Sequence, residues 1–468
     1  MRPALRRRAE RARGFAITTT TEIHAMQTID VNRLIDEARF NRFHWMVLCW
    51  CALLLIFDGY DLFIYGVVLP VLMKTWGLTP LEAGALGSYA LFGMMFGALF
   101  FGPLADRIGR KKGIAICFLL FSGCTVLNGF TRTPTEFGIC RFMAGLGIGG
   151  LMPNVVALMN EYAPKKIRST LVAIMFSGYS LGGMLSAGLG IYMLPRFGWE
   201  AMFHAAAVPL LLLPLILWFL PESVGYLLRQ GRTEQARAIL RRIDPDRVLK
   251  DDDLLEMAEA RSEGAPVLQL FREGRALRTL SIWVAFFCCL LMVYALSSWL
   301  PKMMASAGYS LGSSLSFLLV LNFGAVFGAI GGGWLGDRLN LPKVLVAFFA
   351  VAALSIGLLG FKTPTPVLYG LIAIAGATTI GSQILLYACT AQFYAMAIRS
   401  TGLGWASGIG RNGAIVGPLL GGALVGMSLP LQVNFIAFAI PGLVAAIAMT
   451  LFCAHRQATG AAAGEALA

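Results

Sequence analysis

The sequence predicts an all-α membrane protein with twelve transmembrane helices, arranged as two parallel six-helix repeats. The chain of 468 residues is 57% hydrophobic and only 13% charged, whereas soluble proteins carry about 25% charged residues. Apolar runs recur from Trp45 to Cys453, and each has the roughly 20 residues that a helix needs to cross the bilayer. Helices are expected because the bilayer interior offers the backbone no water to bond with.

The predicted spans form two groups of six on either side of a charged segment. They are 46–70, 82–101, 113–130, 137–161, 169–194, 200–220, 280–305, 313–332, 344–361, 366–395, 400–427 and 431–454. We therefore expect an N-terminal segment 1–44, an N-terminal half 45–220, a central loop 221–279 with short surface helices, a C-terminal half 280–454 and a tail 455–468.

The first residues fit either of two explanations. Residues 1–25 are rich in Arg and then in Thr, as in an amphipathic targeting piece or a start assigned too early. Met26 opens an amphipathic lead into the first span. We expect Met26 to be the true start and residues 1–25 not to be native.

The loop charges predict the orientation of the bundle. Alternate loops are strongly basic, namely 107–112, 165–168, the central segment, 338–343 and Arg399, while the others hold single cations. Positive charge marks the cytoplasmic side, so both termini and the central loop are expected there. The net charge of +13 then follows from topology, and no nucleic-acid partner is expected.

An internal repeat supports the two-half architecture. FGMMFGALFFGPLADR (92–107) aligns without gaps on FGAVFGAIGGGWLGDR (323–338), with nine of sixteen residues identical at an offset of 231. The tetrapeptide IRST recurs at the same offset, at 167–170 and 398–401. Six spans return the chain to the side it started from, so the two halves are parallel repeats.

These segments carry a resemblance to a known family. GPLADRIGRKK (102–112), its weaker copy WLGDRLNLPK (334–343) and RFMAGLGIGG (141–150) resemble the motifs of the major facilitator superfamily. DGYD (58–61), the stretch 152–183 and RSTGLGWASGIGRNGAIVGPLLGG (399–422) together resemble the aromatic acid:proton symporters. The resemblance implies import of benzoate or a hydroxybenzoate by alternating access, across a bacterial inner membrane.

The coupling ion expected from this resemblance is the proton. No cofactor is expected, and the protein is not expected to be an enzyme. Its partners are an aromatic carboxylate and membrane lipid, and we expect a monomer. Nine cysteines and four histidines show no metal-ligand spacing, so no metal site is predicted. The cysteines are better explained as small apolar packing residues.

Asp58 and Asp61 are the candidate proton-coupling residues. A charge at the centre of a membrane helix costs about 2.5–3.5 kcal/mol on insertion scales. Residues three apart lie on one face of a helix, so both carboxyl groups are expected to face a central cavity. Burial and mutual repulsion favour the protonated form of at least one of them. The alternative is a permanent ion pair or helix-end hydrogen bonding.

Arg411 and Arg141 are the candidate partners of a substrate carboxylate. Guanidinium is always charged and can bind a carboxylate through two parallel hydrogen bonds. The alternative for both is a structural ion pair with an aspartate. Amide and aromatic side chains on cavity helices are further candidates for substrate binding, namely Gln383, Asn322, Tyr60 and Trp405.

Conformational gating is expected at the charged loops. The loop signature and its second copy place charges at equivalent positions, where they are predicted to hold one conformation of the rocking cycle. Glu161, near the end of the fourth span, is a further gate candidate or a salt-bridge partner of the loop. The gating candidates are Asp106, Arg107, Arg110, Asp337, Arg338 and Glu161.

Other functions stay open at the level of sequence. The alternatives are a symporter of a non-aromatic carboxylate (muconate, sialic-acid-like or dicarboxylate), a sugar or drug porter, or a receptor that binds an aromatic acid without moving it. PESVGYLL (221–228) lacks the Pro-Arg that ends the sugar-porter motif. GAIVGPLLGG (413–422) resembles a drug-antiporter motif, but it lies in the eleventh span instead of the fifth.

Overall fold

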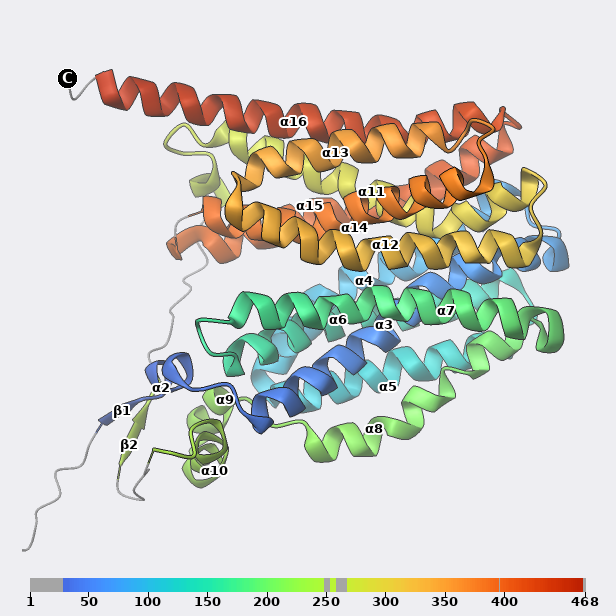
Figure 1. Cartoon of the computed structure of the whole chain (residues 1–468). Helices are drawn as coiled ribbons and strands as arrows, with labels where there is room; N and C mark the ends of the chain where they lie inside the picture. Colours follow the sequence, from blue (N-terminus) through green and yellow to red (C-terminus); the bar gives the residue numbers. More distant parts are fainter. Residues whose placement is uncertain (1–27, 248–252, 258–266, 395, 466–468) are drawn as a thin grey trace, which may run out of the picture.

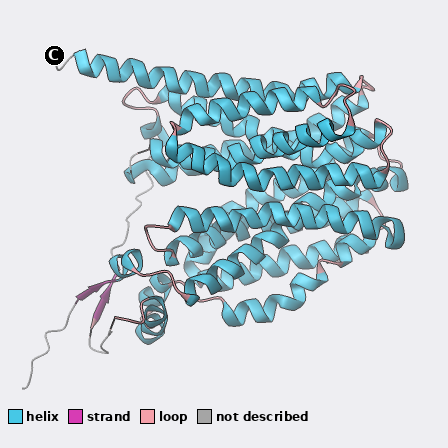
Figure 2. Ribbon diagram, viewed as in Figure 1, coloured by secondary structure: helices cyan, strands magenta, loops and turns pink. Residues whose placement is uncertain are grey.

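A computed structural model describes residues 28–247, 253–257, 267–394 and 396–465. Within these residues twelve helices form a bundle of two halves, shown as a blue-to-green layer and a yellow-to-red layer in Figure 1 and as an all-helical bundle in Figure 2. The N-terminal half comprises α3 (Arg42–Trp76), α4 (Pro80–Ile108), α5 (Arg110–Asn128), α6 (Pro134–Tyr162), α7 (Arg168–His204) and α8 (Ala207–Phe219). The C-terminal half comprises α11 (Ala276–Ser306), α12 (Leu311–Arg338), α13 (Leu341–Leu358), α14 (Thr365–Phe393), α15 (Met396–Gly426) and α16 (Leu431–Glu465).

The predicted fold class is therefore confirmed. Ten stretches of the described residues are long and apolar enough to cross a membrane, and one of them, Thr170–Phe219, covers both α7 and α8. The bundle helix outside this set is α15, which carries Arg399 and Arg411. Eleven of the twelve predicted spans each lie on a single helix of the bundle. The sixth, 200–220, begins in the last turns of α7, after a break in that helix, and continues through α8.

That break separates the fifth predicted span from the sixth. Gly198 has φ 79° and ψ 176°, which are not helical, although hydrogen bonding continues on both sides. A positive φ is far easier for glycine than for a residue with a β-carbon. The chain turns back here, so residues 199–204 precede α8 as part of the sixth span.

The helix starts at one end of the bundle follow from a repeated local sequence. Thr79 and Thr133 are the N-cap residues of α4 and α6, and each accepts a hydrogen bond from the backbone N–H of a glutamate three residues on. That glutamate bonds back to the N-cap, and a proline occupies the first turn. Thr-Pro-x-Glu thus encodes a capping box with a proline whose missing N–H costs nothing.

The internal repeat is visible in the packing. A β-carbon added at Gly97 of α4 would lie 2.0 Å from the carbonyl oxygen of Leu146, and one added at Gly328 of α12 would lie 2.0 Å from that of Ala377. The two glycines are 231 residues apart. Both permit the close helix crossing that small residues allow in membrane bundles, α4 on α6 in one half and α12 on α14 in the other.

The two ends of the bundle differ, and we name them for reference. The basic end is the end where the turn between α4 and α5, the short elements of the central segment and the last described turns of α16 lie, at the left of Figure 1. The far end is the opposite end, where the α3–α4 and α11–α12 turns lie. At the far end the halves are in contact, because the Ser88 hydroxyl of α4 donates to the carbonyl of Ile415 in α15 over 2.7 Å.

Short elements cover the basic end. They are α2 (Val31–Glu37), α9 (Val224–Arg229), α10 (Thr233–Ile243), a 3₁₀ turn η1 (Val267–Leu270), and strands β1 (Thr28–Asp30) and β2 (Leu254–Glu256). The two strands pair in parallel, with Thr28 opposite Leu254. The central helices were expected from sequence and the strand pairing was not. The predicted start at Met26 falls outside the described residues.

Candidate functional site

A cavity of about 530 Å³ lies between the two halves, within the range of ~300–1,000 Å³ found for small-molecule sites. Arg411 lines it in the middle of α15, and Asn160, Arg168 and Arg399 line it at the basic end, so the cavity extends from the middle of the bundle to that end. Its other lining residues come from both halves, namely Leu62, Met94, Met152, Val172, Ala173, Phe176, Tyr179, Tyr294, Ile380, Gln383, Ile384, Tyr387, Ala388 and Ala391.

Arg411 provides the central positive charge of the cavity. Its Nη1 and Nη2 atoms lie 3.9 Å from the sulfurs of Met94 and Met152, which belong to α4 and α6 of the other half. Thioether sulfur is a weak acceptor, and the described residues provide no salt bridge to this guanidinium. Arg411 therefore reaches from the C-terminal half to two sulfurs of the N-terminal half, and most of its N–H donors are left for an anion.

Asp58 is the acidic group beside this cation. Its side chain is fully buried, and neither carboxyl oxygen has a hydrogen-bond partner among the described residues. Its charged neighbours include Arg411 and Asp61. Leu62, one helical turn along α3, lines the cavity. An unsolvated carboxyl group without donors is costly as an anion and much less so when protonated.

Asp61 has a different environment. Its Oδ2 accepts a hydrogen bond of 3.0 Å from Nη1 of Arg141, and its backbone carbonyl accepts one of 3.2 Å from Nη2. The Thr125 hydroxyl donates to its other carboxyl oxygen. Both charged side chains are 1% exposed. Asp61 and Arg141 thus form a buried ion pair joining α3 to α6, while Asp58, three residues away, is left out of it.

The other candidates for substrate binding lie at different places. Gln383 lines the cavity. Asn322 is buried in α12 and donates to the carbonyl of Leu318, while its Oδ1 has no partner within the described part of the chain. The Tyr60 hydroxyl donates to the carbonyl of Met202 over 2.7 Å, away from the cavity. Trp405 is 45% exposed and stacks on Trp283, also outside the cavity lining.

The loop signature forms a network within the N-terminal half. Arg110 pairs with Asp106 at 2.8 Å and with Glu161 at 3.4 Å, and its Nη1 donates to Oδ1 of Asn154 over 2.9 Å. The carboxylate of Glu222 accepts from the backbone N–H of Lys111 and so caps the start of α5. These groups join α4, α5, α6 and the central segment, all on one side of the cavity.

The remaining gating candidates are more peripheral. Arg107 is exposed, and no ion pair is found for it among the described residues. Arg338 is exposed, and its guanidinium lies 4.2 Å from the centre of the Trp334 ring. The side chain of Asp337 falls outside the described residues.

Several lining residues were not singled out from sequence. Tyr179, Phe176 and Val172 follow one another at spacings of three and four on α7, so they share a face, but an apolar face predicts packing as readily as a cavity. Arg168 and Arg399 were noted only as loop charges. The sequence signal that could have identified them is the IRST segment, because the two arginines occupy equivalent positions in its two copies. Each donates to the carbonyl five residues before it, Ala163 and Tyr394.

No group of three or more His, Cys, Asp or Glu side chains suited to a metal is found in the described part of the chain. The cavity offers instead one central guanidinium, tyrosine hydroxyls, the side-chain amides of Gln383 and Asn160, and apolar walls. This set of groups suits a small organic anion with an apolar body.

Comparison with known proteins gives concordant matches over most of the chain. The profile described as Major Facilitator Superfamily matches residues 51–411 and, in a second match, 323–466. The "Benzoate transport protein" of Acinetobacter baylyi is 49% identical over 436 residues, covering 92% of this chain and 94% of that protein. The "Gentisate transporter" of Corynebacterium glutamicum is 38% identical over 402 residues, covering 85% of this chain and 84% of that protein.

Solved structures match at lower identity. The xylose transporter XylE from E. coli in an inward open conformation has a TM-score of 0.68 at 18% identity, covering 86% of this chain and 95% of that one. An inward-facing bacterial homologue of the human lysosomal transporter Spinster has a TM-score of 0.66 at 16% identity, covering 90% and 98%. At these identities the structural likeness shows the fold alone.

The fold, the cavity between two repeats and these relatives together define a multi-pass membrane transporter. The chain belongs to the major facilitator superfamily and, within it, to the family of aromatic acid transporters.

Proposed function

We propose that the protein imports benzoate or a closely related aromatic monocarboxylate together with a proton. The observation that carries this proposal is that Arg411, in a tyrosine-lined cavity, is an electrostatic neighbour of a buried Asp58 that has no hydrogen-bond partner in the described structure. The relative with 49% identity is described as a benzoate transport protein, which supports the choice of substrate class.

Charge balance at the site gives the coupling. With Asp58 ionised, its charge offsets that of Arg411, and a second anion in the cavity is unfavourable. With Asp58 protonated, Arg411 is free to bind a substrate carboxylate through charge-assisted hydrogen bonds. Proton and anion therefore enter and leave together, and the loaded site carries the same net charge as the empty one.

The transport cycle is alternating access. The cavity reaches the basic end, which the positive-inside pattern predicts to be cytoplasmic. In our proposal the structure is therefore the inward-facing state of a protein in a bacterial inner membrane, with both termini in the cytoplasm. The outward-facing state requires the helix contacts at the far end to separate while the basic end closes. One proton with one monoanion makes transport electroneutral.

Uptake by purified protein in proteoliposomes tests this proposal. We expect saturable uptake of labelled benzoate, and Arg411→Lys to weaken its apparent affinity about tenfold to a hundredfold, because lysine keeps the charge but loses the hydrogen-bonding fork. Arg196→Lys is the matched control, since Arg196 lies at the far end with its guanidinium over Tyr192. Uptake of muconate without benzoate, or wild-type affinity in Arg411→Lys, would refute the proposal.

A further inference from the structure

A second, much smaller pocket lies beyond the main cavity, toward the far end. Its free space is only about 10 Å³, which is close to the minimum for one water molecule. Residues nearer the far end of α3, α6 and α11 line it, among them Tyr65, Arg141, Ser297 and Ser298. The closed far end of the bundle thus contains a narrow polar pocket.

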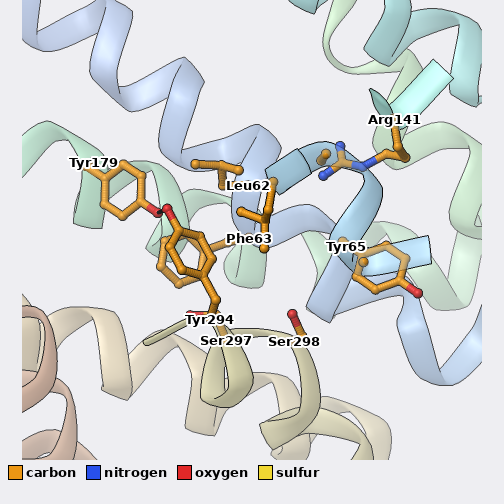
Figure 3. A pocket seen from close by; sticks show the side chains of 11 residues that line it. Leu62, Phe63, Tyr65, Arg141, Tyr179, Tyr294, Ser297 and Ser298 are labelled. Atoms are coloured by element: carbon orange, nitrogen blue, oxygen red, sulfur yellow. Dashed lines mark hydrogen bonds between the residues drawn. The ribbon is translucent and has the colours of Figure 1, made fainter. Parts of the chain in front are cut away.

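Tyr179 and Tyr294 line both pockets. Tyr179 belongs to α7 of the N-terminal half and Tyr294 to α11 of the C-terminal half, and the Tyr179 hydroxyl donates to the Tyr294 oxygen over 3.4 Å. This bond is long for O–H···O, for which 2.5–3.0 Å is typical. Figure 3 shows the two hydroxyls adjacent at one side of the small pocket. The pair therefore stands where the two pockets meet and links the two halves weakly.

Arg141 lies on the other side of the small pocket, as Figure 3 shows. Its side chain is 1% exposed, and its Nη1 and Nη2 atoms each donate a hydrogen bond to Asp61. Its Nε–H has no partner among the described residues. A buried guanidinium donor without an acceptor costs free energy that an incoming anion would recover.

We propose that this pocket is a second carboxylate station on the substrate path, and that the Tyr179–Tyr294 pair is the gate between it and the Arg411 site. This inference rests on the proposed function. When the far end opens, the substrate carboxylate first meets Arg141 and the Ser298 hydroxyl. It then passes between the tyrosine hydroxyls, which donate to it in turn, and reaches Arg411.

The packing at the far end explains why the station is closed in this state. A β-carbon added at Gly66 of α3 would lie 1.9 Å from the carbonyl oxygen of Ser297 in α11. The two helices therefore touch at backbone distance beside the small pocket. Separation of α3 from α11 enlarges the pocket and also parts Tyr294 from Tyr179, so one movement opens the station and the gate.

Removal of single hydroxyl groups tests the gate. Tyr179→Phe and Tyr294→Phe keep the rings but lose a donor to the passing carboxylate, so we expect benzoate entry into proteoliposomes to slow about tenfold or more. Equilibrium affinity of the solubilised inward-facing protein should fall by a smaller factor than the entry rate, because both variants keep Arg411. Tyr369→Phe, which removes a hydroxyl bonded to Ser316 outside the cavity, is the matched control and should transport at the wild-type rate.

Accessibility tests the station. In Ser298→Cys protein we expect a membrane-impermeant thiol reagent added outside to label residue 298 slowly without substrate, when the far end opens transiently, and benzoate to protect it. Peptide mass spectrometry separates this label from the native cysteines. Entry at the wild-type rate in both tyrosine variants, or labelling unaffected by benzoate, overturns the gate and station but leaves the proposed function standing. Absence of benzoate uptake by the wild type overturns the proposed function and this inference with it.

Discussion

At the scale of single residues, the two aspartates of the first span separate into two roles. Asp61 accepts from Arg141 and Thr125, whereas Asp58 has no hydrogen-bond partner in the described structure. A buried ion pair is strongly destabilised when one partner is removed, since the other charge is left without compensation. Removal of a lone buried carboxyl group leaves no opposite charge unpaired, so this cost does not arise.

Substitution of each aspartate should therefore affect stability differently. Asp61→Asn leaves Arg141 buried and unpaired, and we expect a loss of about 3–5 kcal/mol in the free energy of unfolding. Asp58→Asn should leave stability unchanged or slightly raised, because it replaces a buried acid by a neutral isostere. Thermal unfolding in detergent measures both. Equal destabilisation by the two variants would contradict the separate roles.

Part of this site was predictable from residues alone. Arg411 and Gln383 could be predicted, because intramembrane charges and amides need a functional or structural partner. Both line the cavity. The choice between Asp58 and Asp61 for Arg141 was not predictable, since both share one helix face. Tyr60 and Trp405 face other surroundings, because aromatic side chains in membrane helices serve packing and lipid contact as readily as binding.

At the scale of helices, glycine contacts decide which conformations are possible. The α3–α11 crossing at Gly66 and Ser297 closes the far end and has no room for a β-carbon. A larger residue there opposes the inward-facing state but does not oppose a state in which these helices are apart.

Gly66→Val should hold the far end open. We expect the variant to fold and to lose benzoate transport, with residue 298 of a Gly66→Val/Ser298→Cys protein labelled from outside faster than residue 298 of the Ser298→Cys protein. Gly123→Val is the matched control, since nothing lies within 4 Å of a β-carbon added at Gly123 of α5. Wild-type transport in Gly66→Val would show that the α3–α11 contact is not needed for the cycle.

The Arg110 network is the second feature at this scale. Its partners Asp106, Glu161 and Asn154 all belong to the N-terminal half, so in this state it braces one half instead of joining two. The loop signature was predicted to hold one conformation. That role stays a prediction, because it concerns contacts in another state.

Arg110→Ala should lower the stability of the protein by roughly 1–3 kcal/mol, because the buried amide oxygen of Asn154 and the partly buried carboxylate of Glu161 lose a charged donor. Arg107→Ala should change stability by less than about 0.5 kcal/mol, as is usual for an exposed residue away from such networks. The comparison of thermal unfolding in the two variants checks this. Equal effects would mean that the loop charge as a whole matters and the network does not.

At the scale of the whole molecule, the repeat made most of the fold predictable. Hydrophobic length gave the spans, the shared offset of 231 gave the parallel halves, and the same offset relates Gly97 to Gly328 and Arg168 to Arg399 in the structure. The conformational state was not predictable, because the proposed alternating access requires one sequence to stabilise inward-facing and outward-facing packings to similar degrees. The strand pairing of Thr28–Asp30 with Leu254–Glu256 joins segments too short to give a sequence signal.

Proton-driven accumulation tests the central claim most directly. Proteoliposomes with wild-type protein or with Asp58→Asn are given labelled benzoate, with and without an inward proton gradient, and benzoate exchange at equal pH is measured beside accumulation. We predict that the wild type accumulates benzoate only with the gradient, and that Asp58→Asn exchanges benzoate but does not accumulate it. Gradient-driven accumulation by Asp58→Asn at the wild-type level would contradict the account, because the proton would then be carried elsewhere.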